Sequence, residues 1–198
     1  MEELIFASNN EHKAEEIRKI IGKSFVIKTL KESGININIP EPHDTLEENA
    51  TEKSSVIYRL TKMDCFSEDT GLEVDALNGE PGVKSSRYAE DEPLKNNIDT
   101  LLNKLKNKSN RTAQFRTVIS LMLKGKEHQF QGACKGTIIA KQRGEKGFGY
   151  DPVFMPEGSN KTFAEMDIEE KNTYSHRRKA IEKLVGFLKQ LKEHKNIQ

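Results

Sequence analysis

The chain has 198 residues, enough to bury the core of one domain, and its 32 Lys and Arg against 31 Asp and Glu leave a net charge of +1. This balance argues against a general nucleic-acid binder, which normally carries a clear basic excess. No apolar run approaches the ~20 residues of a membrane span, and the acidic start at Met1-Glu2-Glu3 lacks the basic region of a signal peptide.

Two cysteines occur, Cys65 and Cys134, far apart in the sequence and without metal-ligand spacing. A disulfide framework and a structural zinc site are therefore not expected. We expect reduced thiols and a cytoplasmic protein with neither a nucleic acid nor a membrane as its partner. Because no linker or internal repeat is visible, we treat residues 1–198 as a single domain.

The first half of the chain alternates predicted strands and helices. Strands are expected at 4–7 and 25–27, with a helix between them, and a half-exposed strand is expected from Ile35 to Ile39. A second helix is expected after Thr45, where Glu48 would complete a capping box. The apolar stripes of the two helices are Ala14, Ile17 and Ile21 in the first and Leu46, Ala50, Ile57 and Leu60 in the second.

The second half combines helices with a hairpin. Runs of β-forming residues at 115–123 and 127–139 flank Lys124-Gly125-Lys126, a good hairpin turn, and a last helix begins near Ser175. Together with the crossover helices, this hairpin predicts an α/β fold with a mixed sheet. A third helix is indicated by Leu94, Ile98, Leu101, Leu102 and Leu105.

The most informative segment is Ser67-Glu68-Asp69-Thr70-Gly71-Leu72, where a predicted strand gives way to a glycine turn. Two carboxylates at such an edge suit a hard cation that keeps several waters and clamps phosphate oxygens, as magnesium does. An ordinary surface turn is the alternative, because Asp, Thr and Gly are common turn residues.

A second polar segment, Ser8-Asn9-Asn10-Glu11-His12-Lys13, follows the first strand and opens the first helix. A helix N-terminus presents backbone N–H groups and a partial positive charge, which favour phosphate, and Lys13 adds a full charge. The alternative is a simple helix cap followed by a solvated lysine. The segment is neither a Walker loop nor a dinucleotide-binding glycine motif.

Four motifs occur in one order along the chain. They are Ser8-Asn9-Asn10-x-x-Lys13-x-x-Glu16, Glu68-Asp69-Thr70-Gly71-Leu72, Phe148-Gly149-Tyr150-Asp151-Pro152 and Ser175-His176-Arg177. The set resembles the Ham1 family of inosine triphosphate pyrophosphatases, and the resemblance extends from Leu4 to the final helix. It implies an elongated α/β fold with a central mixed, twisted sheet flanked by helices, a substrate cleft between two lobes, and a homodimer.

The resemblance also implies magnesium-dependent hydrolysis of the purine nucleoside triphosphates ITP, dITP and XTP to the monophosphate and pyrophosphate. Asp69 would be the catalytic carboxylate and a metal ligand. Ser8, Asn10 and Lys13 would hold the triphosphate, and Lys53 would help from the second helix. Further residues that would contact the substrate are Asn9, Thr70 and Gly149. The residues that would form the nucleobase pocket are Phe148, Tyr150, Asp151, Lys171, His176 and Arg177.

The chain departs from the family pattern at two places. Many relatives have glycine where Asn9 stands. The metal-binding glutamate expected before the second helix is assigned to Glu41, between two prolines, although Asp44 or Glu68 could take its role.

Three rival functions remain: a pyrophosphatase for another modified nucleotide, a non-catalytic nucleotide-binding module, and a nucleic-acid binder that uses the basic run at 177–179. The intact Asp69 argues against the second rival, and the charge balance argues against the third.

Overall fold

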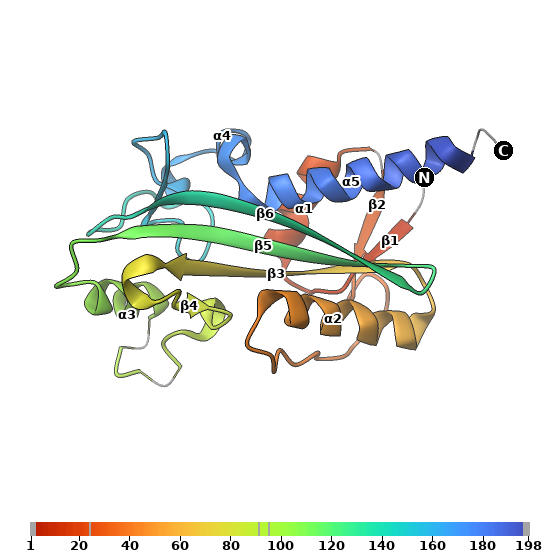
Figure 1. Ribbon diagram of the computed structural model, residues 1–198, viewed down its shortest axis with the longest axis horizontal. Coiled ribbons are helices and arrows are strands. Elements are labelled where there is room, and N and C mark those ends of the chain that lie inside the picture. Colours follow the sequence, from red (N-terminus) through yellow and green to blue (C-terminus); the bar gives the residue numbers. More distant parts are fainter. Residues whose placement is uncertain (1–2, 24, 91, 95, 196–198) are drawn as a thin grey trace. The chain divides into compact units, whose positions relative to one another are not determined.

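The computed structural model describes residues 3–23, 25–90, 92–94 and 96–195 (Figure 1). The strands are β1 (Glu3–Phe6), β2 (Val26–Thr29), β3 (Cys65–Val74), β4 (Pro81–Gly82), β5 (Thr112–Leu123), β6 (Lys126–Ile138) and β7 (Phe154–Pro156). The α-helices are α1 (Glu11–Ile21), α2 (Leu46–Thr61), α3 (Asn97–Lys104), α4 (Ile168–Tyr174) and α5 (His176–Lys195). Short 3-10 turns are η1 (Asp75–Leu77), η2 (Ser85–Arg87) and η3 (Phe163–Glu165).

The strands form one mixed sheet in the order β2-β1-β3-β5-β6-β7, with β4 paired to β3. β1 is parallel to both β2 and β3, whereas the pairs β3–β4 and β6–β7 are antiparallel. β5 and β6 are joined by the Lys124-Gly125 turn, which confirms the predicted hairpin. The predicted α/β class with a mixed sheet flanked by helices is confirmed.

The chain divides into two compact units whose segments interleave along the sequence. The first unit holds the chain up to Asp69, Thr117–Gly132 and the chain from Arg177 onward. The second unit holds Thr70–Arg116 and Ala133–His176. Each unit is therefore built from segments that are distant in the sequence, and β3, β5 and β6 each contribute residues to both.

In the first unit, helices cover both faces of the sheet. Leu4 and Phe6 of β1 pack with α1 and α5 on one face, while Ile5 packs with α2 on the other. Figure 1 shows the same arrangement, with α1 and α5 on one side of the strands and α2 on the opposite side. This alternation follows from the two-residue period of a strand, and it explains why β1 is apolar on both faces.

The second unit has a core rich in aromatic side chains. Phe115, Phe154 and Phe163 lie with ring centroids 4.7 to 6.1 Å apart. Leu101 of α3 and Leu105, the residue just after α3, join this cluster and are fully buried. Separate cores in the two units explain how each can be compact although its chain is discontinuous.

One sequence-based expectation about the acidic segment is wrong. The segment is not a turn: β3 continues without interruption from Cys65 to Val74, so Asp69 lies in the middle of a strand. Gly71 is needed there for packing, because a Cβ atom on it would lie 2.7 Å from the carbonyl oxygen of Gly82 in β4. The glycine permits the close approach of two strands rather than a reversal of the chain.

Other expectations fail at the edges of elements. Residues 35–39 form no strand, and α3 begins only at Asn97, where the Asn96 side chain accepts hydrogen bonds from two backbone N–H groups. Leu60, expected in the apolar stripe of the second helix, is 59% exposed, and Leu94, expected in the third helix, lies before it and is 41% exposed. Within the described ranges, no helix is both long and apolar enough to cross a membrane.

Candidate active site

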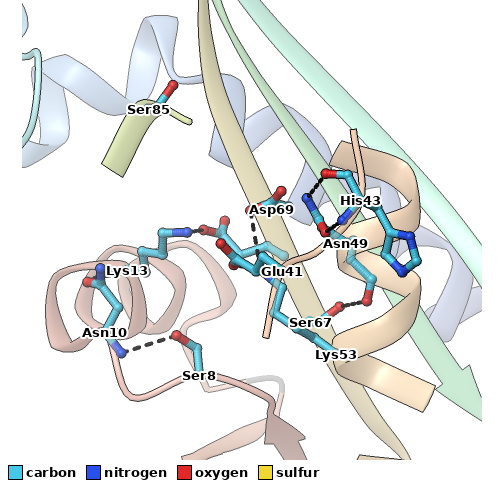
Figure 2. Close-up of polar contacts among 12 residues, drawn as sticks. Ser8, Asn10, Lys13, Glu41, His43, Asn49, Lys53, Ser67, Asp69 and Ser85 are labelled. Atoms are coloured by element: carbon cyan, nitrogen blue, oxygen red, sulfur yellow. Dashed lines mark hydrogen bonds and ion pairs between the residues drawn. The ribbon is translucent and has the colours of Figure 1, made fainter. Parts of the chain in front are cut away.

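The turn between β1 and α1 is held by its own polar side chains. Ser8 Oγ accepts a hydrogen bond from the backbone N–H of Asn10 at 3.1 Å, and Asn10 Oδ1 caps α1 by accepting from the N–H of Lys13 at 3.1 Å. Asn9 Oδ1 accepts from the backbone N–H of Lys31 at 2.8 Å, which ties the turn to the segment after β2. Figure 2 shows Ser8 and Asn10 on this turn, with the Lys13 side chain extending from α1.

Lys13 belongs to a buried network of four charged groups in the first unit. Its Nζ lies 2.8 Å from Glu68 Oε1, while Arg177 binds both oxygens of Glu68, at 2.8 and 3.2 Å. Arg177 also contacts Glu16 through Nη1. Burial alone would raise the pKa of Glu68, but Arg177 and Lys13 outweigh it and hold that pKa well below its usual range. The guanidinium of Arg177, 1% exposed, thus lies between two carboxylates of α1 and β3.

Asp69, Lys53 and Glu41 form a second charged group in the same unit (Figure 2). Lys53 Nζ lies 2.6 Å from Glu41 Oε1 and 3.2 Å from Asp69 Oδ1. Burial lowers the pKa of Lys53, but the two carboxylates outweigh it, so the net shift is upward and the ammonium remains charged. Burial also raises the pKa of Asp69; Lys53 opposes this shift and Glu41 adds to it.

The same group fits a divalent cation. Asp69 Oδ2 is buried and has no hydrogen-bond partner among the described residues, an arrangement that is costly unless a ligand satisfies it. Of the proposed second ligands, Glu68 is already bound by two cationic side chains and Asp44 is exposed, which favours Glu41. The described part of the chain holds no cluster of three or more metal-binding side chains. Magnesium suits such a site, because it is often bound by one or two carboxylates together with water and phosphate oxygens.

In the second unit, a buried ion pair supports the loop that was expected to contact the base. Lys171 Nζ lies 2.7 Å from Asp151 Oδ2, which also accepts from the backbone N–H of Phe148 at 3.0 Å. The Lys171 ammonium lies 5.2 Å from the centre of the partly exposed Phe148 ring. Gly147 and Gly149 both have positive φ, and a Cβ on Gly147 would lie 2.1 Å from Asp151 Oδ2. The glycines therefore let the loop close over the carboxylate.

The remaining predicted substrate-contacting residues, Tyr150, His176 and Thr70, belong to the second unit. The Tyr150 hydroxyl donates to the backbone oxygen of Ser85 at 2.9 Å, and burial raises the pKa of Tyr150. The His176 ring stacks on Phe115 with centroids 4.9 Å apart. Thr70 follows Asp69 in β3 and is partly buried. Packing thus accounts for much of the surroundings of Tyr150 and His176.

Two residues to which sequence reasoning assigned no site role lie in or beside these groups. Glu16 appeared only as a motif position, yet it is 6% exposed and binds Arg177, 161 positions away. Asn49 is fully buried on the face of α2 that carries Lys53. A signal for Asn49 was available, because it lies at helical spacing with Leu46 and Lys53.

Comparison with known proteins assigns the family. A model of the Ham1 family matches residues 4–187, from β1 into α5. The chain belongs to the Ham1 family. The Ham1 match therefore includes every residue of the charged groups described above, and the family predicted from the four motifs is confirmed.

Relatives support the same assignment. A dITP/XTP pyrophosphatase from Flavobacterium johnsoniae is 48% identical over 186 residues, which cover 93% of this chain and 97% of the relative. The solved Ham1 protein of Staphylococcus aureus is 39% identical, with a TM-score of 0.85 over 96% of this chain and 99% of its own. A HAM1 protein from Coxiella burnetii is 34% identical, with a TM-score of 0.86 over 96% of this chain and 100% of its own.

Proposed function

We propose that this Ham1 chain hydrolyses the deaminated purine nucleoside triphosphates ITP, dITP and XTP to the monophosphate and pyrophosphate, with magnesium as cofactor. The observation that carries the proposal is the group of Asp69, Lys53 and Glu41, in which a buried carboxylate oxygen has no partner among the described residues. The names of the curated relatives, dITP/XTP pyrophosphatases, support the same reaction.

The phosphates need positive charge close to where they bind. Lys53 is held in place by two carboxylates, and Lys13 lies at the start of α1, where backbone N–H groups also favour anions. The Lys13 side chain is 17% exposed and can therefore be reached by a phosphate oxygen. In this proposal Ser8, Asn10 and Lys13 hold the triphosphate, and Lys53 acts from α2.

Asp69 and Glu41 would hold the magnesium ion. When bound, the ion would neutralise the negative charge of the phosphate oxygens. Asp69 would orient the attacking water and accept its proton, while Lys53 keeps the carboxylate in position. An aspartate is a weak base, with a pKa of ~3.9 in model peptides, so its contribution must come mainly from position.

The base would be selected by hydrogen bonding and stacking. Hypoxanthine and xanthine carry a 6-oxo acceptor where adenine carries a 6-amino donor. A backbone N–H of the protein would pair with the oxo group but face another donor in adenine, because the other predicted donor, Arg177, is 1% exposed and bound to Glu68 and Glu16. A buried polar group left unpaired costs ~1–3 kcal/mol, and several such bonds together discriminate more strongly. Phe148, partly exposed, would stack on the purine.

The cell compartment and the assembly belong to the same proposal. A cytoplasmic location is supported by the two buried thiols, Cys65 and Cys134. A homodimer is proposed from the family resemblance alone.

The test is pyrophosphate release from ITP, XTP, dITP, ATP and GTP in parallel, with magnesium and with an excess of EDTA. Strong release from the first three substrates, little from the last two and none with EDTA is the expected result. Release of single phosphates would contradict the reaction. Tight ITP binding without release would instead support a nucleotide-binding module, and turnover of a different modified nucleotide would support the other rival.

A further inference from the structure

Asn49 binds both backbone polar groups of one residue in the segment that carries Glu41. Its Oδ1 accepts from the N–H of His43 at 3.0 Å, and its Nδ2 donates to the carbonyl oxygen of His43 at 3.1 Å. Figure 2 shows the two bonds side by side, between α2 and the segment that precedes it. Asn49 is fully buried, so the pair is protected from competition by water.

The segment around Glu41 that Asn49 holds has few backbone hydrogen-bond donors of its own. Residues 35–42 form neither helix nor strand. Pro40 and Pro42 have no amide hydrogen, so the N–H groups of Glu41 and His43 are the donors between 40 and 43. One of these two donors is bound by Asn49. The Asn49 side chain therefore holds a backbone that is not paired in any helix or strand.

Asn49 and Lys53 lie one turn apart on the same face of α2. Asn49 holds the backbone at His43, while Lys53 holds the Glu41 carboxylate, two residues earlier, and also contacts Asp69. One helix thus fixes both the main chain and the side chain of the segment relative to the unpaired oxygen of Asp69. Two attachment points restrict Glu41 much more than the ion pair alone would.

We propose that Asn49 is a positioning residue that holds Glu41 where it can share a divalent cation with Asp69. The proposal rests on the proposed function for the identity of the cation site. Without the two bonds to His43, the segment between the prolines would sample other conformations, and the cation would have to restrict it on binding. The conformational entropy lost when the cation orders the segment would appear as weaker binding of the cation.

The experiment measures Mn²⁺ binding to the full chain by the electron paramagnetic resonance signal of the free ion. Asn49→Ala removes both bonds and is expected to weaken Mn²⁺ binding tenfold or more. Ser54→Ala is the matched control. It removes two polar contacts of the same helix, between Ser54 Oγ and Ser120 Oγ at 2.7 Å and between Ser54 Oγ and the carbonyl oxygen of Thr51 at 3.1 Å, without touching the segment. Melting temperatures of both variants show whether their losses of stability are comparable.

A second variant separates position from charge. Asn49→Asp keeps the shape and the acceptor but places an oxygen against the carbonyl oxygen of His43. Positioning predicts that it weakens Mn²⁺ binding, whereas simple attraction by the added negative charge would strengthen it. It also keeps the test informative if Asn49→Ala does not fold.

The inference is overturned if Asn49→Ala binds Mn²⁺ as the wild type does, if Ser54→Ala loses as much affinity, or if Asn49→Asp binds more tightly. Turnover of ITP by the wild type is assayed separately. If the wild type turns over ITP but the Asn49 variants bind Mn²⁺ as the wild type does, the proposed function stands and the positioning role of Asn49 is excluded. If the Asn49 variants bind Mn²⁺ more weakly but the wild type does not turn over ITP, the positioning role stands and the proposed function is excluded.

Discussion

At the scale of single residues, burial of charge dominates this protein. Arg177, Glu16 and Glu68 are all nearly inaccessible, and each is bound by a partner of opposite charge. Removing one member of such a group leaves another charge buried without compensation, which typically costs more than the pair contributes. Arg177 must therefore affect stability as well as any contact with substrate.

Replacing Arg177 tests this argument. Arg177→Met is expected to lower the free energy of unfolding by about 3–5 kcal/mol, measured by urea denaturation. The control is Arg178→Met, because Arg178 forms an exposed pair with Glu182 four residues on, and such pairs contribute only ~0.3–0.5 kcal/mol. Equal unfolding midpoints in the two variants would contradict the structural role of Arg177.

Asp69 provides the corresponding test of catalysis. Asp69→Asn keeps the shape and still accepts a hydrogen bond from Lys53, but it removes the negative charge and the base. We expect pyrophosphate release from ITP to fall at least ~100-fold while the melting temperature changes little. Asp75→Asn, at an exposed carboxylate just after β3, should retain activity. Activity of Asp69→Asn close to that of the wild type would remove Asp69 from the proposed mechanism.

At the scale of elements, α2 is attached to the sheet by polar as well as apolar contacts. Ser54 and Ser120 are fully buried with their hydroxyl oxygens 2.7 Å apart, and Ser120 donates to Glu127 at 2.7 Å. Because an ionised carboxylate only accepts, Ser120 must donate to Glu127, whereas the single hydroxyl proton of Ser54 can go either to Ser120 or to the carbonyl oxygen of Thr51 at 3.1 Å. Glu127 therefore fixes the direction of the Ser120 hydrogen bond in this short chain of polar contacts between helix and hairpin.

The chain of bonds predicts a pH dependence. Burial raises the pKa of Glu127, but hydrogen bonds from Thr51, Ser120 and Gln129 outweigh it, so the pKa is lowered. A lowered pKa adds stability above the unfolded value of ~4.3, and this stability is lost as pH falls through the folded value. Glu127→Ala should therefore melt below the wild type at pH 7 and approach it near pH 3. A difference that stays constant between these pH values would contradict the argument.

At the scale of the whole molecule, the interleaving of the two units makes the chain ends essential. α5 belongs to the first unit, whose other segments lie before Asp69 and between Thr117 and Gly132. Its side chains Ile181, Leu184 and Leu188 are buried in that unit's core with residues of β1 and α1. The first unit is thus completed only after nearly the entire chain has been synthesised.

Ending the chain at His176 tests this dependence. The three buried side chains of α5 contribute roughly 5–9 kcal/mol by burial, comparable to the whole stability of a typical domain. We expect the shortened chain to lose the cooperative thermal transition of the first unit, followed by circular dichroism. A chain ending at Lys192 keeps all three residues and should melt as the full chain does. Cooperative melting of the shorter chain at the wild-type temperature would contradict this role of α5.

The sequence by itself determined the elements and motifs whose signals are local. Apolar spacing located α1, α2 and α5, because a helix repeats its buried face every three or four residues. The Lys124-Gly125 turn predicted the hairpin, and Thr45 predicted the start of α2, where its hydroxyl accepts from the N–H of Glu48. Four short motifs in order were enough to predict the Ham1 family.

Only the tertiary structure decided which of these residues meet. The sequence suggested a turn at Gly71, but strand pairing with Gly82 places Asp69 in the middle of β3. Glu16 and Arg177 lie 161 positions apart, and no local pattern pairs them. The periodicity of apolar residues indicates which face of a helix or strand is buried. Which residue packs against that face depends on contacts between distant parts of the chain. That is why the charged groups around Asp69 and Arg177 became visible only in the folded chain.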